Sequence, residues 1–205
     1  MIEGLFKKRN LLTALILFGT AVGCSSGDKD DDGVSATPSE CTESYPEQST
    51  SLYNLPYSIG TAYIVGQGNC TDGSHSDDQN YAYDFDMPVG TIIIASREGT
   101  VVAVEERFED GNGTSGQENF VIVRHSDNTV SGYYHLTQDG VQVEVGASIS
   151  QGDAIALSGN TGDSSEPHLH FEVLECLDCD TLPVNFRNTR SHSNGLVEGE
   201  NYEAF

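Results

Sequence analysis

Two histidines lie two residues apart in the segment PHLHFEV at 167–173, where polar and apolar side chains alternate. Successive side chains of a β-strand point to opposite faces, so His168, His170 and Glu172 would share one face. With a rise of about 3.3 Å per residue, the two imidazoles would lie roughly 6 to 7 Å apart. Imidazoles bind zinc and move protons near neutral pH. The segment therefore predicts a metal ligand with a close neighbour, or else a solvated polar face.

Further residues that could bind a metal are scattered along the chain. Of the six histidines, His135 ends a strand-like run and His75 lies in a polar loop. In the run YAYDFD at 81–86, Asp84 and Asp86 would share one strand face. Single histidines are often structural and carboxylates are common on surfaces. Sequence spacing alone therefore does not bring these positions together.

The elements that must position these residues are short and rich in β-branched side chains. Strand-like segments separated by Gly, Asp and Asn occur at 91–96, 99–104, 120–125, 130–135, 141–145, 154–157 and 167–173. This pattern predicts an all-β fold, an antiparallel β-sandwich or barrel. No segment after residue 24 shows a convincing helical period. The glycine-rich insert 109–116 is predicted to be a mobile loop between two strands.

The first 23 residues are predicted to be a secretory signal peptide. Basic residues at 7–9 precede a short apolar stretch at 11–18, and small residues follow. The segment AVGC at 21–24 resembles the lipobox of bacterial lipoproteins, although Ala21 stands where leucine is usual. The resemblance implies a mature chain that is anchored to a membrane by lipid on Cys24. Because Ser25 follows the cysteine, it also implies the outer membrane, facing the periplasm.

Residues 24–50 are polar and acidic, with too little apolar surface to offset the entropy of ordering them. We therefore expect a flexible tether over 24–50 and one domain over 51–205. The whole chain carries a formal net charge of -23. Such a surface should repel nucleic acid, so we do not expect nucleic acid as a partner.

The four cysteines that remain after Cys24 form an even set, which predicts disulfides in an oxidising compartment. They are Cys41, Cys70, Cys176 and Cys179. Three pairings are possible, and one of them closes Cys176 on Cys179 and joins Cys41 to Cys70. A redox Cys-x-x-Cys motif or a structural zinc site is the competing interpretation.

Four stretches together resemble the lysostaphin-type, or LytM-type, zinc metallopeptidases, which have an all-β duplicated hybrid motif fold. Many of these enzymes cut peptide bonds in bacterial cell walls. The stretches follow the family's order. The first contains SH at 74–75, YAYDF at 81–85 and MPVGT at 87–91, and the second is ASREGTVV at 95–102. The third is YHL at 134–136, and the fourth contains residues 146–152, SGNTG at 158–162 and PHLHF at 167–171.

The resemblance implies the role of each site residue. His75, Asp84 and His170 correspond to zinc ligands, and His135 and His168 to catalytic histidines beside the metal. Three protein ligands would leave one position on Zn²⁺ open for water, as catalytic zinc requires. One histidine would take the proton of the attacking water, and the other would stabilise the oxyanion or protonate the leaving amine.

The chain departs from the family pattern at two places. Many members have an aspartate four residues after the first histidine, where this chain has Gln79. A variant with the longer spacing favours Asp84 over Asp77 and Asp78 as the ligand. Glu166 also stands where glycine commonly precedes Pro-His-Leu-His. His125 and His192 match no catalytic position and are expected to be structural or exposed.

The resemblance implies a lipid-anchored zinc metalloendopeptidase that cleaves the peptide crosslinks of peptidoglycan. Two alternatives remain open at the level of sequence. Some relatives lack metal ligands and activate cell-wall amidases without being enzymes, but this chain retains all five site residues. The substrate could also be an ordinary protein.

Overall fold

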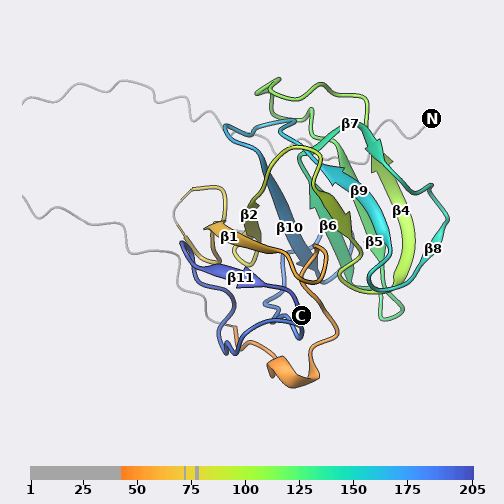
Figure 1. Ribbon diagram of the computed structural model, residues 1–205. Helices are drawn as coiled ribbons and strands as arrows, with labels where there is room; N and C mark the ends of the chain where they lie inside the picture. Colours follow the sequence, from red (N-terminus) through yellow and green to blue (C-terminus); the bar gives the residue numbers. More distant parts are fainter. Residues whose placement is uncertain (1–42, 72, 77–78) are drawn as a thin grey trace, which may run out of the picture. The chain divides into compact units, whose positions relative to one another are not determined.

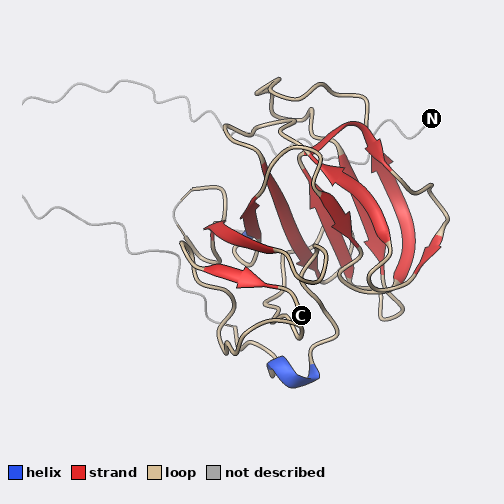
Figure 2. Cartoon of the chain, in the orientation of Figure 1, coloured by secondary structure: helices blue, strands red, loops and turns tan. Residues whose placement is uncertain are grey.

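The computed structural model describes residues 43–71, 73–76 and 79–205. Within them, nearly all regular structure is β-strand, with one 3₁₀ helix, η1 (Gln48–Thr50) (Figure 2). The predicted all-β class is therefore confirmed. The predicted signal peptide, Cys24, Cys41 and the alternative ligands Asp77 and Asp78 lie outside the described residues. No helix in the described ranges is long and apolar enough to cross a membrane.

Eight strands form one antiparallel sheet (Figure 1). In spatial order they are β11 (Asn201–Glu203), β1 (Ala62–Gln67), β2 (Tyr83–Asp86), β10 (His168–Leu174), β6 (Val130–Tyr134), β5 (Phe120–Arg124), β4 (Gly99–Glu105) and β8 (Ser148–Ile149). Strand β10 lies between β2 and β6, although 86 residues separate His170 from its partner Asp84. The centre of the sheet therefore joins distant parts of the sequence.

A second sheet of three strands consists of β3 (Ile92–Ile94), β9 (Ala154–Ser158) and β7 (Leu136–Val141). Buried residues of both sheets form one apolar core. Phe85, Leu169 and Phe171 enter it from the large sheet, and Ile93 and Ile155 from the small one. Alternation along β10 places its apolar residues in this core and its polar residues on the opposite face.

The polar face of β10 is not a solvated one. Only 6% of His170 and 4% of Glu172 are exposed, so both faces of this strand are covered.

The predicted strand at 141–145 was wrong beyond Val141, where β7 ends. Gln142 donates one further hydrogen bond to Ile155, and the chain then turns at Gly146, whose φ is 92°. The β-branched side chains had suggested a longer strand, but Val145 is 57% exposed.

The segment just before residue 51 packs against the C-terminal part of the chain. The Nε2 atom of Gln48, in η1, donates hydrogen bonds to the carbonyl oxygens of Phe186, Thr189 and Arg190 at 2.9 to 3.1 Å. Ser51 donates a hydrogen bond to the carbonyl oxygen of Asn185. The last residues of the expected tether thus have fixed partners.

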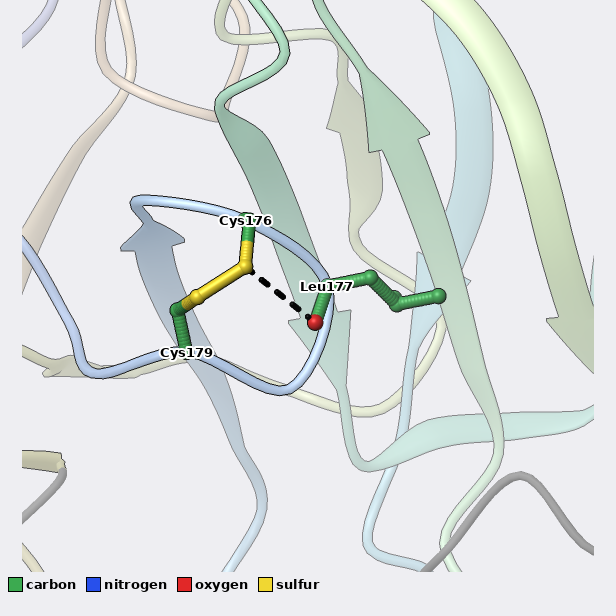
Figure 3. Close-up of a disulfide and its surroundings, with 3 residues drawn as sticks. All are labelled: Cys176, Leu177 and Cys179. Atoms are coloured by element: carbon green, nitrogen blue, oxygen red, sulfur yellow. Dashed lines mark hydrogen bonds between the residues drawn. A yellow bond between two sulfur atoms is a disulfide. The ribbon is translucent and has the colours of Figure 1, made fainter.

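Cys176 and Cys179 form a disulfide in the loop that follows β10 (Figure 3). Cys176 Sγ lies 3.4 Å from the Leu177 carbonyl oxygen, which is a contact because a disulfide sulfur has no proton to donate. The bond confirms the pairing that closes this loop on itself and excludes a zinc site at these two sulfurs. Cys70 is disulfide-bonded as well.

Candidate metal centre

Three side chains from distant parts of the sequence meet beside the centre of the large sheet. Asp84 on β2 and His170 on β10 are direct partners in the strand pairing, and the two strands lie side by side in Figure 1. His75 reaches them from the loop between β1 and β2. One donor atom from each residue lies within 4.8 Å of the other two. The structure therefore brings together the three predicted ligands.

Two of the three distances between the donor atoms match those around a single zinc ion, and the third is shorter. Asp84 Oδ1 lies 2.9 Å from His170 Nδ1 and 3.3 Å from His75 Nε2, and the two nitrogens are 3.4 Å apart. Tetrahedral zinc with bonds of about 2.0 to 2.2 Å needs donors roughly 3.3 to 3.5 Å apart. Two nitrogens and one carboxylate oxygen also match the donor set of catalytic zinc.

The backbone fixes the orientation of the His75 ring. Its Nδ1 atom lies 2.8 Å from the carbonyl oxygen of Gly68, and the side chain is fully buried. A carbonyl can only accept, so Nδ1 carries the proton and Nε2 presents its lone pair towards Asp84 and His170. Cys70 lies in the same loop, and its amide donates to the Asn80 carbonyl oxygen at 2.7 Å. The loop thus presents His75 in the tautomer that a metal ligand requires.

The charges around His170 favour a cation at this place. Burial alone would raise the pKa of Asp84, but the hydrogen bond from His170 and the neighbouring His75 lower it well below its usual value. Burial alone would lower the pKa of His170, but the carboxylates of Asp84 and Glu172 raise it to about 10. Two carboxylates therefore flank one buried imidazole. A metal ion can supply the positive charge that a proton otherwise supplies.

The two predicted catalytic histidines lie next to this cluster and to each other. The ring centroids of His135 and His168 are 4.6 Å apart, and those of His135 and His170 are 5.9 Å apart. His168 Nδ1 lies 2.8 Å from the Glu166 carbonyl oxygen, and its Nε2 lies 3.7 Å from Asp84 Oδ1. All five predicted site residues thus occupy one place in the structure.

His135 is neutral at pH 7. Burial and the neighbouring His170 and His168 lower its pKa to about 4. Its Nδ1 lies 2.6 Å from the Thr161 carbonyl oxygen, so Nδ1 carries the proton and Nε2 is left with a lone pair. The backbone of His135 has a φ of 60°, a left-handed conformation that costs free energy in a residue other than glycine. Such strain is typical of residues at functional sites.

The cluster is open on one side. His75 and His170 are buried, whereas the side chains of Asp84 and His168 are 14% and 15% exposed. A substrate would therefore approach from the side of Asp84 and His168. Asp86, which pairs with His168 in the strand register, is an exposed carboxylate on that side.

The loop predicted at 109–116 is tied to the segment that leads into β10. Asp110 Oδ1 accepts a hydrogen bond from the Asn160 amide at 2.6 Å, and its Oδ2 accepts one from Thr137 Oγ1. The Gly111 amide donates to the Asn160 carbonyl oxygen at 2.8 Å. These contacts support the segment whose Thr161 carbonyl orients His135, a connection that sequence spacing did not indicate.

The remaining histidines lie outside the cluster. His125 is buried and contacts the Glu98 carbonyl oxygen and Ser131 Oγ, each at 2.7 Å. His192 Nε2 accepts a hydrogen bond from the Phe186 amide at 3.0 Å. Both therefore have structural partners.

The sequence profile of peptidase family M23 matches residues 78–185, slightly more than half of the chain. The chain belongs to peptidase family M23. The matched segment of this M23 chain contains four of the five site residues, and His75 precedes it. The family resemblance inferred from the sequence is confirmed.

The M23 chain is similar to several curated bacterial proteins, among them a peptidoglycan endopeptidase and a murein hydrolase activator. It is 36% identical over 91 residues to the peptidoglycan DD-endopeptidase ShyA of Vibrio cholerae, covering 44% of this chain and 19% of ShyA. It is 35% identical over 98 residues to the murein hydrolase activator NlpD of Escherichia coli, covering 48% of this chain and 24% of NlpD. The matches thus span no more than about a quarter of these relatives.

A solved structure shares the fold. The catalytic domain of the prophage-encoded M23 protein EnpA from Enterococcus faecalis has a TM-score of 0.50 at 20% sequence identity. The similarity covers 62% of this chain and 93% of that domain. The two proteins therefore share the all-β fold of M23 domains.

Proposed function

We propose that this chain is a zinc metalloendopeptidase that cleaves peptide crosslinks of bacterial peptidoglycan. The observation that carries the proposal is the convergence of the donor atoms of His75, Asp84 and His170 beside two further histidines. The membership of family M23 and the similarity to a named peptidoglycan endopeptidase support it.

In the proposed reaction, His75, Asp84 and His170 bind zinc. When bound, zinc would supply a Lewis acid that polarises the scissile carbonyl and lowers the pKa of water, so that water can lose a proton and attack near neutral pH. His135 is neutral, and its Nε2 would accept the proton of the attacking water. His168 would stabilise the developing oxyanion or donate a proton to the leaving amine, because its side chain lies beside Asp84 and is one of the more exposed in the cluster.

The similarity to NlpD raises a second possibility, that the chain activates a cell-wall hydrolase without cleaving the wall itself. The complete donor set supports the enzyme instead. A binding partner has no need of three donor atoms at zinc spacing, two of them buried, with a neutral histidine alongside.

We also propose that the protein acts in the cell envelope, anchored by lipid on Cys24 to the outer membrane and facing the periplasm. The lipobox-like segment at 21–24 and the apolar stretch at 11–18 support this location. A polar segment after the lipid would allow a membrane-bound domain to reach the wall.

The test uses the full-length chain purified in detergent, with its zinc content measured first. The zinc-loaded protein is incubated with purified peptidoglycan and, separately, with casein. The matched variant is His168→Ala, which keeps the three proposed ligands. New amino groups in soluble wall fragments, produced by the wild type and not by the variant, are the expected result. A fully zinc-loaded protein that cleaves neither substrate would contradict the enzyme, and cleavage of casein alone would contradict the wall substrate.

A further inference from the structure

We infer that Glu172 is a positioning residue for the metal centre: in the zinc-loaded protein its buried carboxylate would accept a hydrogen bond from Nε2–H of His170 and so direct Nδ1 towards the metal. The inference rests on the proposed function, because it assigns a role towards the zinc that the function requires. It concerns a residue that neither coordinates the metal nor contacts the substrate.

Two buried polar atoms without partners face each other at this place. Across the described residues, five buried side-chain atoms have no hydrogen-bond partner, and two of them are His170 Nε2 and Glu172 Oε2. These two atoms are 3.6 Å apart. A buried group without a partner costs about 1 to 3 kcal/mol, and a charged group costs more. The pair therefore needs an explanation beyond strand packing.

The strand geometry places Glu172 beside His170. Side chains two residues apart on β10 lie on the same face, so the carboxylate stands next to the imidazole. On the neighbouring strand β6, the residue paired with Glu172 is Gly132. A Cβ atom at Gly132 would lie 2.4 Å from Cε2 of Tyr134 and 2.9 Å from its hydroxyl, so the Tyr134 side chain fills this space.

Tyr134 is a second neighbour of the carboxylate and also contacts His170, with ring centroids 5.6 Å apart. Burial, followed by the negative charge of Glu172, raises the pKa of Tyr134 well above its ordinary value, so the phenol stays protonated. The carboxylate therefore has an imidazole and a neutral phenol as neighbours. Water has little access to it, since only 4% of Glu172 is exposed.

This arrangement fixes the tautomer of His170, and a different acceptor fixes that of His75. A histidine can coordinate through Nδ1 only when the proton resides on Nε2. For His75 the Gly68 carbonyl fixes the tautomer from the backbone. For His170 the Glu172 carboxylate is the acceptor on the opposite nitrogen, while Nδ1 faces Asp84 at 2.9 Å. A carboxylate in this role also makes the imidazole a stronger donor to the metal.

The test measures zinc affinity of the full-length chain in detergent by competition with a chromophoric chelator at pH 7. The variants are Glu172→Gln, which keeps the shape of the side chain, and Asp86→Asn as the matched control. Asp86 lies on the neighbouring strand beside His168, so the control removes a nearby charge without affecting Nε2 of His170. We expect Glu172→Gln to weaken zinc binding about 10- to 100-fold and to change the visible spectrum of the cobalt-substituted protein. Asp86→Asn should weaken binding by less than about threefold, because exposed charges are screened.

Equal zinc affinity in Glu172→Gln and the wild type would overturn the inference, as would equal losses in both variants. Should Glu172→Gln fail to fold, the wild type decides: ¹⁵N NMR of the zinc-loaded protein should show a proton on His170 Nε2 that is protected from exchange with water. A proton that exchanges freely would overturn the inference. A wild type that binds no zinc would contradict the proposed function itself, whereas zinc binding and wall cleavage with an unaffected Glu172→Gln would contradict this inference alone.

Discussion

The Nδ1 atom of His135 lies 2.6 Å from the carbonyl oxygen of Thr161, in the loop that leads from β9 to β10. His135 itself lies between β6 and β7, so two loops cooperate to orient one imidazole. Thr161 is further fixed because its Oγ1 donates to the Leu136 carbonyl oxygen at 2.8 Å and accepts from the Asn119 amide at 3.0 Å. The proton acceptor proposed for catalysis is therefore positioned by backbone that is itself buried.

Gly159→Ala should displace this loop. A Cβ atom at Gly159 would lie 2.3 Å from the Thr137 amide nitrogen and 2.5 Å from the Leu136 carbonyl carbon, so the backbone must move. We expect wall cleavage to fall at least about 100-fold, because small misplacements of catalytic groups have effects of that size. Zinc content should change little, since no ligand lies in the loop. Activity close to that of the wild type would contradict this account of His135.

Replacement of the proposed ligands should remove the metal. His75→Ala, Asp84→Asn and His170→Ala should each purify with far less than one zinc per chain, because two protein donors bind zinc much more weakly than three. Metal analysis after dialysis gives the measurement. His192→Gln is the control, since His192 lies outside the cluster and should leave the zinc content unchanged. A variant of any one ligand that retained full zinc would remove that residue from the site.

The two other histidines should separate catalysis from metal binding. His135→Asn and His168→Ala should retain zinc, but cleavage of peptidoglycan should fall about 10²- to 10⁴-fold, the range typical for loss of general acid–base catalysis. Zinc content and cleavage rate are measured on the same preparations. Loss of zinc together with activity would show that the residue supports the metal instead.

His125 should contribute to the pH dependence of the free energy of unfolding. Burial lowers the pKa of this histidine below 6.5, so below that pH the unfolded chain binds more protons than the folded one. His125 therefore makes the free energy of unfolding fall as the pH drops from about 7 to 5. Denaturant titrations at both pH values should show a smaller decrease for His125→Gln than for the wild type. The same decrease in both proteins would mean that His125 does not titrate on unfolding.

Cys24→Ser should release the protein from the membrane fraction, because the proposed lipid is attached to that thiol. Fractionation of expressing cells, followed by detection of the chain, gives the measurement. Cys176→Ser is the control, since its partner is in the loop after β10. Persistent membrane association of the Cys24→Ser variant would contradict lipid anchoring at this residue.

The alternation along β10 allowed the shared face of His168, His170 and Glu172 to be predicted from the sequence. It did not predict that this face is buried, because burial depends on residues from other parts of the chain, such as His75 and Tyr134, which contact His170. The pairing of Asp84 with His170 is likewise a long-range contact that no local period specifies. Only the family resemblance linked these residues before the structure did.

The loop at 109–116 shows the same limit. Its glycines and asparagines predicted a loop between strands, which the structure contains. Its hydrogen bonds to Asn160 and Thr137 depend on how three separate segments meet. Short polar side chains such as Asp110 carry no local signal for a partner about 50 residues away.

The two oxygens of Asp110 have a consequence for protein engineering. One binds the segment that leads into β10, and the other binds Thr137 on β7. The Asp110 side chain thus joins the loop to the backbone at Asn160 and to Thr137, and a loop without a side-chain acceptor at position 110 would lose both bonds. A chimera between family members that transplants the two segments together should therefore keep the orientation of His135.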